Sequence, residues 1–209
     1  MISVASGKRG LYRNVQPFIL ASASPRREEL LGAVGLAFEV IVSGIEETSH
    51  FGEAPEELAK RWAAEKVQAV SRVRPDDWVL GADTIVVLEG TVFGKPANPV
   101  EAASMLKQLS GKLHNVITGM SLVHHARRFS RSGAVRTEVG FKELSDAEIG
   151  AYVATGEPLD KAGAYGIQGM GASLVRSVRG SYTNVVGLPL CEALEWLLDE
   201  HVIAPENTA

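Results

Sequence analysis

Hydrophobic positions along the chain form two kinds of pattern: short apolar runs, and longer stretches in which apolar residues recur at helical spacing. The runs predict β-strands, and the one at residues 78–88 is apolar enough to lie in the centre of a sheet. The stretch at residues 55–73 predicts an amphipathic helix, because Leu58, Trp62 and Val70 fall on one stripe. We also expect strands at residues 18–21, 38–42, 114–125, 134–141 and 173–178, and helices at residues 99–109, 145–155 and 190–201, with another helix starting at Pro25.

The link between the first expected strand and the helix after it carries an unusual set of polar groups. Ser24 occupies the N-cap position and Pro25 the first helical position. Arg26 and Arg27 follow, although the helix dipole disfavours cations at this end. Free backbone N–H groups, the hydroxyls of Ser22 and Ser24 and two guanidinium groups predict an anion site, with phosphate as the usual occupant. The alternative is a solvated arginine pair neutralised by nearby carboxylates.

Two charged positions come next, and each has two interpretations. Glu46 and Glu47 directly follow the expected strand at residues 38–42, so they either supply a metal ligand or belong to a solvated loop. Lys66 comes four residues after Trp62 and therefore lies on or beside the apolar stripe of its helix. Its ammonium group either extends to solvent along that stripe or projects into a cleft and meets an anion.

Asp83 interrupts the apolar strand at residues 78–88. A carboxylate in a buried strand needs a metal, a cation or hydrogen-bond donors, because burial without them is very costly. The alternative to a functional role is a structural salt bridge. Gly81 beside it allows another group to approach the backbone closely. The short turn at residues 89–90 predicts a hairpin that brings Lys95 back toward the Asp83 end.

A glycine-rich stretch at residues 156–172 favours neither a regular helix nor a regular strand. It suits a loop whose backbone closes around a ligand, and Gln168 within it offers both a donor and an acceptor to a base edge. It is not a Walker A loop, and no dinucleotide-binding fingerprint is present. A flexible surface loop is the alternative.

Composition and charge narrow the class of protein. The 209 residues suffice for one sizeable domain or two small lobes, and a net charge of −4 argues against a general nucleic-acid binder. The single cysteine, Cys191, excludes an internal disulfide and is expected to be a buried structural thiol in the last helix. No apolar run reaches membrane-spanning length, and residues 1–16 are expected to be a flexible extension without a secretory signal. Residues 126–133 predict a basic hairpin tip, the histidines show no metal-binding spacing, and a reducing cytoplasm fits these features.

Together these stretches resemble the Maf family of nucleoside triphosphate pyrophosphatases, almost end to end from residue 18 to the last helix. The resemblance rests on five motifs in the right order: Ser22-Ala-Ser-Pro-Arg-Arg27, Gly81-Ala-Asp-Thr-Ile-Val86, Gly94-Lys-Pro96, Asp160-Lys-Ala-Gly-Ala-Tyr-Gly-Ile-Gln-Gly169 and Gly180-Ser-Tyr-Thr-Asn-Val-Val-Gly-Leu-Pro189. It implies an α/β fold of the Maf/Ham1-like type, with an elongated mixed central β-sheet flanked by helices and two lobes with an active-site cleft between them. It also implies one such domain over residues 17–205, a divalent cation and a homodimer.

Within the family the chain is similar to the branch that cleaves dTTP and UTP, on the strength of Arg26, Thr84 and Gln168. The implied reaction is attack of water on the α-phosphorus, releasing pyrophosphate and the nucleoside monophosphate, with modified pyrimidine triphosphates as further substrates in a nucleotide-pool-cleansing role. The resemblance implies that Lys66, Lys95 and Glu47 act in catalysis with Asp83, the proton acceptor. Glu47 and Asp83 would hold the metal, Mg²⁺ with Mn²⁺ or Co²⁺ as alternatives. The residues expected to bind substrate are Ser22, Ser24, Arg26, Arg27, Thr84, Asp160, Lys161 and Gln168.

Two other functions remain open at this point. One is a nucleotide-binding regulator associated with septum formation, in which catalysis is vestigial. The other is a pyrophosphatase of the branch that prefers 7-methyl-GTP. The complete set of charged residues favours an enzyme, with a nucleoside triphosphate as its partner and neither nucleic acid nor a membrane.

Overall fold

A mixed β-sheet runs through the whole molecule in the computed structural model, which describes residues 2–3, 10–48 and 52–206. Three neighbouring strands, β4 (Phe38–Val40), β3 (Phe18–Leu20) and β5 (Trp78–Leu88), are parallel, and the other described pairs are antiparallel. This arrangement confirms the expected α/β fold with a mixed sheet. In sheet order the strands are β1 (Ile2–Ser3), β4 (Phe38–Val40), β3 (Phe18–Leu20), β5 (Trp78–Leu88), β7 (Leu113–His124), β8 (Phe129–Phe141) and β9 (Val175–Arg179), and β6 (Thr91–Phe93) also pairs with β5.

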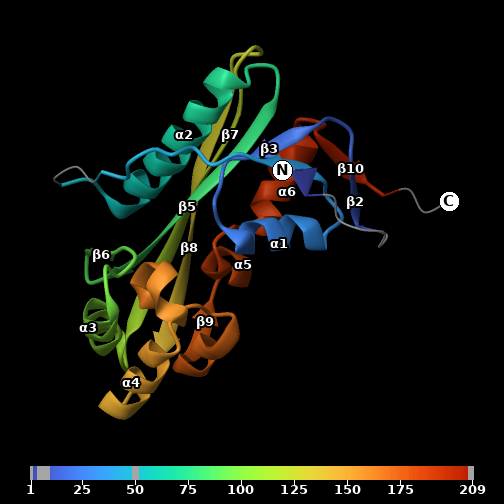
Figure 1. Cartoon of the computed structure of the whole chain (residues 1–209). Coiled ribbons are helices and arrows are strands. Elements are labelled where there is room, and N and C mark those ends of the chain that lie inside the picture. The colour runs from blue at the N-terminus through green and yellow to red at the C-terminus, as the bar shows by residue number, and fades with distance from the viewer. Residues whose placement is uncertain (1, 4–9, 49–51, 207–209) are drawn as a thin grey trace.

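Three long antiparallel strands, β5, β7 and β8, give the molecule its elongated shape (Figure 1). Helices cover this sheet in two groups along its length. The helices are α1 (Pro25–Ala33), α2 (Pro55–Val73), α3 (Pro99–Leu109), α4 (Asp146–Ala154), α5 (Tyr182–Val186) and α6 (Leu190–Asp199), with 3₁₀ turns η1 (Glu157–Asp160), η2 (Ala162–Ala164) and η3 (Gly169–Leu174). In the described part of the chain, no helix is both long and apolar enough to cross a membrane.

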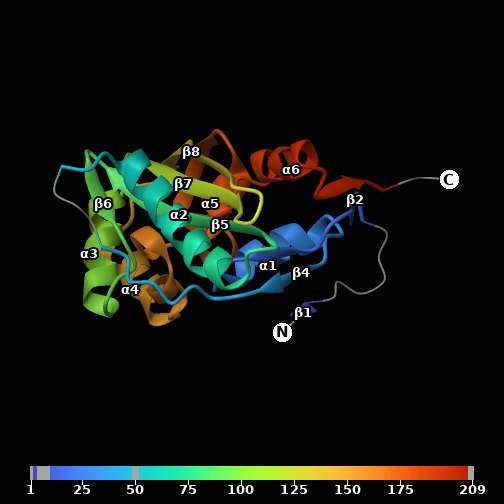
Figure 2. The same cartoon turned by 90° about the horizontal axis from the view of Figure 1, so that it is seen from above.

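Two hydrophobic clusters divide the molecule into lobes. The first lies between α1, α6 and the start of β5, and it includes Phe18, Leu31, Trp78 and Leu197. The second lies between α3, α4 and the far ends of β5, β7 and β8. Since the long strands belong to both clusters, the lobes share one sheet rather than being joined by a linker (Figures 1 and 2).

Helix α2 lies over β5 and β7 on one face of the sheet (Figure 2). Two glycines permit this close approach. A β-carbon at Gly119 of β7 would collide with the backbone of Ala59, and one at Gly81 of β5 would collide with the side chain of Val67. Gly119 pairs with Asp83 in the sheet register, so this close approach of helix and sheet lies beside the Asp83 carboxylate.

One edge of β5 has a gap between two short partner strands. Strand β3 pairs with β5 up to Leu80, and β6 pairs with it from Val86 onward. Between these points, no strand of the described chain pairs with residues 81–85 on this edge, while β7 pairs with them on the other. Successive strand residues face opposite sides of a sheet, so Asp83 and Thr84 project from the two faces at this gap.

Several sequence-based expectations need correction. Strand β8 begins at Phe129 rather than after residue 133, because β7 and β8 pair as far as His124 and Phe129 and leave a much shorter tip than predicted. Cys191 is exposed, contrary to the expected burial. Position 191 falls outside the buried stripe of α6, which consists of Ala193, Leu194, Trp196 and Leu197.

The N-terminal segment expected to be a flexible extension is only partly described. Within it, β2 (Tyr12–Asn14) pairs with β10 (Ile203–Pro205) to form a second, two-stranded sheet. The Asn14 amide also donates a 2.8 Å hydrogen bond to the Ala37 carbonyl. Residues 10–16 are thus attached to the first lobe, and the domain boundary at residue 17 stays a prediction.

His114 predicts a pH dependence of stability. It is buried between the rings of Phe141 and Tyr165, its Nε2 lies 2.8 Å from Tyr165 Oη, and its Nδ1 has no partner in the described structure. Burial lowers the pKa of His114 to about 4. Below pH 6.5 the unfolded chain therefore binds a proton that the folded chain does not, so the free energy of unfolding should fall as the pH drops toward 4, by at most about 3 kcal/mol.

Urea denaturation at pH 7, 6 and 5 measures this effect. The variant His114→Gln keeps a hydrogen-bonding group for Tyr165 and does not titrate, so its stability should depend less on pH over this range. If the free energy of unfolding fell equally with pH in the wild type and in His114→Gln, the prediction would be contradicted.

Candidate active site

A cavity of about 590 Å³ opens at the gap in the β5 edge and is lined from both lobes. Side chains from the loop before α1, from α2, from β5 and from the segment after α4 meet there, although they are far apart in sequence. Glu46, the other candidate metal ligand beside Glu47, does not line this cavity. The twelve residues expected to act in catalysis or to bind substrate or metal all line it: Ser22, Ser24, Arg26, Arg27, Glu47, Lys66, Asp83, Thr84, Lys95, Asp160, Lys161 and Gln168.

Lys66 lies between two carboxylates at one side of the cavity. Its Nζ contacts Asp83 Oδ1 and lies 2.6 Å from Glu47 Oε1. The side chain of Lys66 is 14% exposed and that of Asp83 7%, whereas that of Glu47 is 45% exposed. The ammonium group therefore projects into the cleft, and it links a buried acid to one open to solvent.

Asp83 is a buried carboxylate with one unused oxygen. Its Oδ2 has no hydrogen-bond partner in the described structure. Burial raises the pKa of Asp83, and the positive charges of Lys66 and Arg27 oppose that rise. Because an unpartnered buried acceptor is costly, this oxygen marks a place where a donor or cation would be stabilised.

Arg27 is a buried cation on the other face of β5. Its guanidinium group donates to the Gly187 carbonyl at 2.7 Å, to Ser22 Oγ at 3.1 Å and to Thr84 Oγ1 at 3.1 Å. These bonds use three of its five N–H groups and leave two for a ligand. Burial lowers the pKa of Arg27, and the charge of Asp83 opposes this effect. Thr84 Oγ1 also lies 2.9 Å from Thr118 Oγ1, so its hydroxyl is held in place from two sides.

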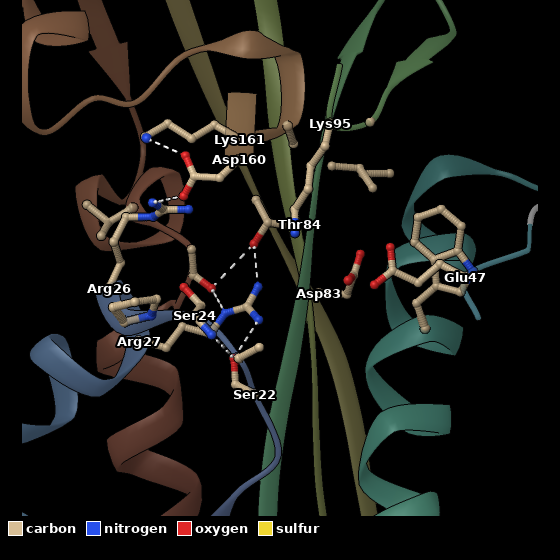
Figure 3. Close-up of a pocket in the computed structure, with 18 of the residues that line it drawn as sticks. Ser22, Ser24, Arg26, Arg27, Glu47, Asp83, Thr84, Lys95, Asp160 and Lys161 are labelled. Carbon is tan, nitrogen blue, oxygen red and sulfur yellow. Dashed lines mark hydrogen bonds and ion pairs between the residues drawn. The ribbon is translucent and has the colours of Figure 1, made fainter. Parts of the chain in front are cut away.

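Arg26 belongs to a chain of charges at the opposite wall (Figure 3). Its Nη1 lies 3.2 Å from Asp160 Oδ2, and Asp160 Oδ1 lies 2.6 Å from Lys161 Nζ. Lys161 Nζ also donates to the Glu157 carbonyl at 2.6 Å. Ser24 occupies the N-cap position of α1, as expected, but its side chain makes no hydrogen bond that caps the helix.

Lys95 and Gln168 complete the cavity from the second lobe. Figure 3 shows Lys95 extending into the cavity from the end of the β5–β6 hairpin. This placement agrees with the position expected from the short turn. Gln168 precedes η3, lines the cavity and makes no side-chain hydrogen bond within the described residues.

The donor set is compatible with a divalent cation. In the described chain no group of three or more His, Cys, Asp or Glu side chains is arranged to hold a metal on its own. Mg²⁺ commonly takes one or two carboxylates and completes its coordination with phosphate oxygens and water. Glu47 and Asp83 offer two carboxylates, and the unpartnered Asp83 Oδ2 supplies a free acceptor.

Sequence reasoning missed several groups that shape the site. The Gly187 carbonyl and Thr118 hydroxyl hold Arg27 and Thr84, and their contacts span 160 and 34 positions in the chain. The motif containing Gly187 was recognised, but a carbonyl acceptor leaves no mark in a side-chain pattern.

Comparisons with known proteins agree with this geometry. Residues 17–200 match the family model described as "Maf-like protein". A protein of Syntrophus aciditrophicus named dTTP/UTP pyrophosphatase is 52% identical over 184 residues, 88% of this chain and 90% of its own length. A protein of Geobacter metallireducens with the same name is 53% identical over 177 residues, which cover 85% of this chain and 92% of that protein.

A solved structure gives independent support for the fold. The HAM1 protein from Coxiella burnetii is similar with a TM-score of 0.50 and 15% identity, over 89% of this chain and 100% of that one. At that identity the likeness concerns the fold alone. The family match and the two curated relatives extend over most of the chain, and it belongs to the Maf family.

Proposed function

We propose that this chain hydrolyses dTTP and UTP to the nucleoside monophosphate and pyrophosphate, by attack of water on the α-phosphorus. The observation that carries the proposal is the convergence of four cations and two carboxylates on one cavity: Arg26, Arg27, Lys66, Lys95, Glu47 and Asp83. The relatives named dTTP/UTP pyrophosphatase support the choice of nucleotide.

The cationic side chains would bind and orient the triphosphate. It carries about four negative charges near neutral pH, so neutralising and positioning them is the main catalytic requirement. The two free N–H groups of Arg27 and the ammonium group of Lys95 are available for phosphate oxygens. Arg26, paired with the exposed Asp160, would exchange that surface ion pair for substrate at little cost.

Asp83 would accept the proton of the attacking water. Burial raises the pKa of Asp83, which makes the carboxylate a better proton acceptor than an exposed one. Lys66 contacts Asp83 and would also contact phosphate when the nucleotide binds. A bound divalent cation, Mg²⁺ being the proposed one, would supply charge neutralisation at the phosphates, with Glu47 and Asp83 holding it.

The base would be read by Gln168, whose amide offers a donor and an acceptor to the edge of a pyrimidine. Thr84 has its hydroxyl committed to Arg27 and Thr118, so its contribution to the base would be indirect, through the position of Arg27. Arg26 would also contribute to the choice of nucleotide. A homodimer in the cytoplasm completes the proposal.

A substrate panel tests this function. With Mg²⁺ present, dTTP and UTP should be hydrolysed at least tenfold more efficiently than CTP, GTP or 7-methyl-GTP, with pyrophosphate as the released product. In ¹⁸O-labelled water the label should enter the nucleoside monophosphate, because the water oxygen bonds to the α-phosphorus.

Three results would contradict the proposal in different ways. Release of orthophosphate would exclude cleavage between the α- and β-phosphates. Label in pyrophosphate would place the attack on the β-phosphorus. Preference for 7-methyl-GTP would overturn the choice of base and leave the reaction unchanged.

A further inference from the structure

The segment that carries Gln168 is held by hydrogen bonds from outside the cavity. Glu157 accepts the Gly171 N–H through Oε1 and the Met170 N–H through Oε2, both at 3.0 Å. Tyr152 Oη donates to Glu157 Oε1 at 2.9 Å and accepts from the Gly166 N–H at 3.2 Å. Three backbone N–H groups on both sides of Gln168 are therefore bound by one pair of side chains.

The backbone between these anchors folds back tightly on itself. A β-carbon at Gly171 would collide with the Gly166 carbonyl and with Tyr152 Oη. Gly169 has a φ of +70°, a conformation that favours glycine, and faces the Glu157 carboxylate. The turn that presents Gln168 thus has little room to rearrange while both anchors are in place.

The charge state of the anchor pair suits this role. Although burial acts to raise the pKa of Glu157, the N–H groups of Gly171 and Met170 and the Tyr152 hydroxyl hold it below its ordinary value. Burial raises the pKa of Tyr152. At neutral pH the pair is a carboxylate and a neutral phenol, and the carboxylate accepts three hydrogen bonds.

From this arrangement we infer that Glu157 and Tyr152 are positioning residues for nucleotide selectivity, which they set by fixing the backbone that carries Gln168. The inference rests on the proposed function, in which Gln168 reads the base. Gln168 lines the cavity, whereas neither anchor does, so the pair would act through Gln168 and not on the phosphates. Thymine and cytosine differ in donor and acceptor character at N3 and C4, and a fixed backbone limits the positions from which the Gln168 amide can reach that edge.

The test compares kcat/KM for dTTP and dCTP in Glu157→Gln and Tyr152→Phe. Glu157→Gln replaces one acceptor oxygen with an NH₂ group that faces N–H donors, so it should lower the dTTP/dCTP ratio about tenfold. Tyr152→Phe removes a single hydroxyl and should lower it about threefold. Most of the change should be a higher KM for dTTP, with kcat within about threefold of the wild-type value.

Glu148→Gln is the matched control. Glu148 lies in the first turn of α4, close in sequence to the anchors, but its carboxylate bonds Ser145 and Lys142 and does not contact the Gln168 segment. The dTTP/dCTP ratio of kcat/KM for Glu148→Gln should equal that of the wild type. A general loss of folded protein lowers the rates for both nucleotides alike and leaves the ratio unchanged, so the ratio separates positioning from stability.

A double variant tests whether the anchors act through Gln168. In a Gln168→Ala background, Glu157→Gln should leave the ratio unchanged, because the group that it positions is gone. An unchanged ratio in both single variants, or a further fall in the Gln168→Ala background, would overturn the inference.

Binding of α,β-imido-dTTP and α,β-imido-dCTP to the same variants separates this inference from the proposed function. If the wild type fails to hydrolyse dTTP, the proposed function is wrong. The Kd for the dTTP analogue divided by that for the dCTP analogue then decides the positioning role alone: a rise of this ratio in Glu157→Gln supports it, and no change overturns it.

Discussion

Asp83→Asn should lower kcat for dTTP about 10³-fold, the typical loss when a general base is removed. An asparagine amide has nearly the same shape as the carboxylate and can still contact Lys66, but it cannot take a proton from water. Binding of α,β-imido-dTTP measured without a divalent cation should change less than fivefold, because Arg26, Arg27 and Lys95 are untouched. Steady-state kinetics and isothermal titration calorimetry measure the two quantities separately.

Asp77→Asn is a control for loss of an acidic group. Asp77 Oδ2 forms an ion pair with Arg74 at 2.8 Å and does not line the cavity, so kcat should be unchanged. If Asp83→Asn kept more than a tenth of the wild-type kcat, Asp83 would not be the proton acceptor. If the wild type itself bound dTTP without turnover, a nucleotide-binding regulator would account for the site better than an enzyme.

Lys66→Met should lower the free energy of unfolding by about 3 kcal/mol, since removing one partner of a buried ion pair leaves the other charge without compensation. Methionine matches the length of the lysine stem, so the helix can keep its packing on the sheet. Asp83 would then be buried beside no ammonium group. In the same variant kcat/KM for dTTP should fall about 10²-fold, because a cation that contacts the substrate in the proposed reaction is lost.

Two further variants show whether loss of the buried ion pair causes the loss of stability in Lys66→Met. Lys60→Met removes a lysine from the same helix whose partner is the exposed Glu57, and its stability should change by less than about 0.5 kcal/mol. The double variant Lys66→Met/Asp83→Asn should recover part of the lost stability, because the buried carboxylate that lost its ammonium partner is gone as well. Urea denaturation of the four proteins gives these differences. Equal stabilities for Lys60→Met and Lys66→Met would contradict the prediction.

Local patterns in the sequence were sufficient to locate the elements and the polar groups of the site. The strand carrying Asp83 begins and ends where its apolar run does, at Trp78 and Leu88. The short turn after it was enough to expect Lys95 in the same cavity. Both inferences succeed because their causes are local: the period of a strand, and a hairpin too short to lead elsewhere.

Features set by distant contacts did not follow from those patterns. The apolar pattern of the last helix predicts a buried Cys191, yet the neighbours of α6 decide which face packs inward, and they leave this thiol exposed. Thr84 is expected to bind substrate, and this stays a prediction, but the bonds of its hydroxyl to Thr118 and Arg27 do not follow from a local pattern, because only the tertiary fold brings these residues together. Glu157 was passed over because its partners are backbone N–H groups, which every sequence contains.

The interrupted edge of β5 has a mechanical consequence. Because β5 and β7 continue unbroken beneath the cavity and enter both hydrophobic clusters, the two halves of the described structure share continuous strands instead of being joined by a hinge. Widening the mouth would require bending a hydrogen-bonded ribbon, which is stiffer than rotating about a loop. The entrance to the cavity therefore keeps a nearly constant width. Nucleotides of different size would be selected by how well they fit this entrance, and not by a conformational change of the protein.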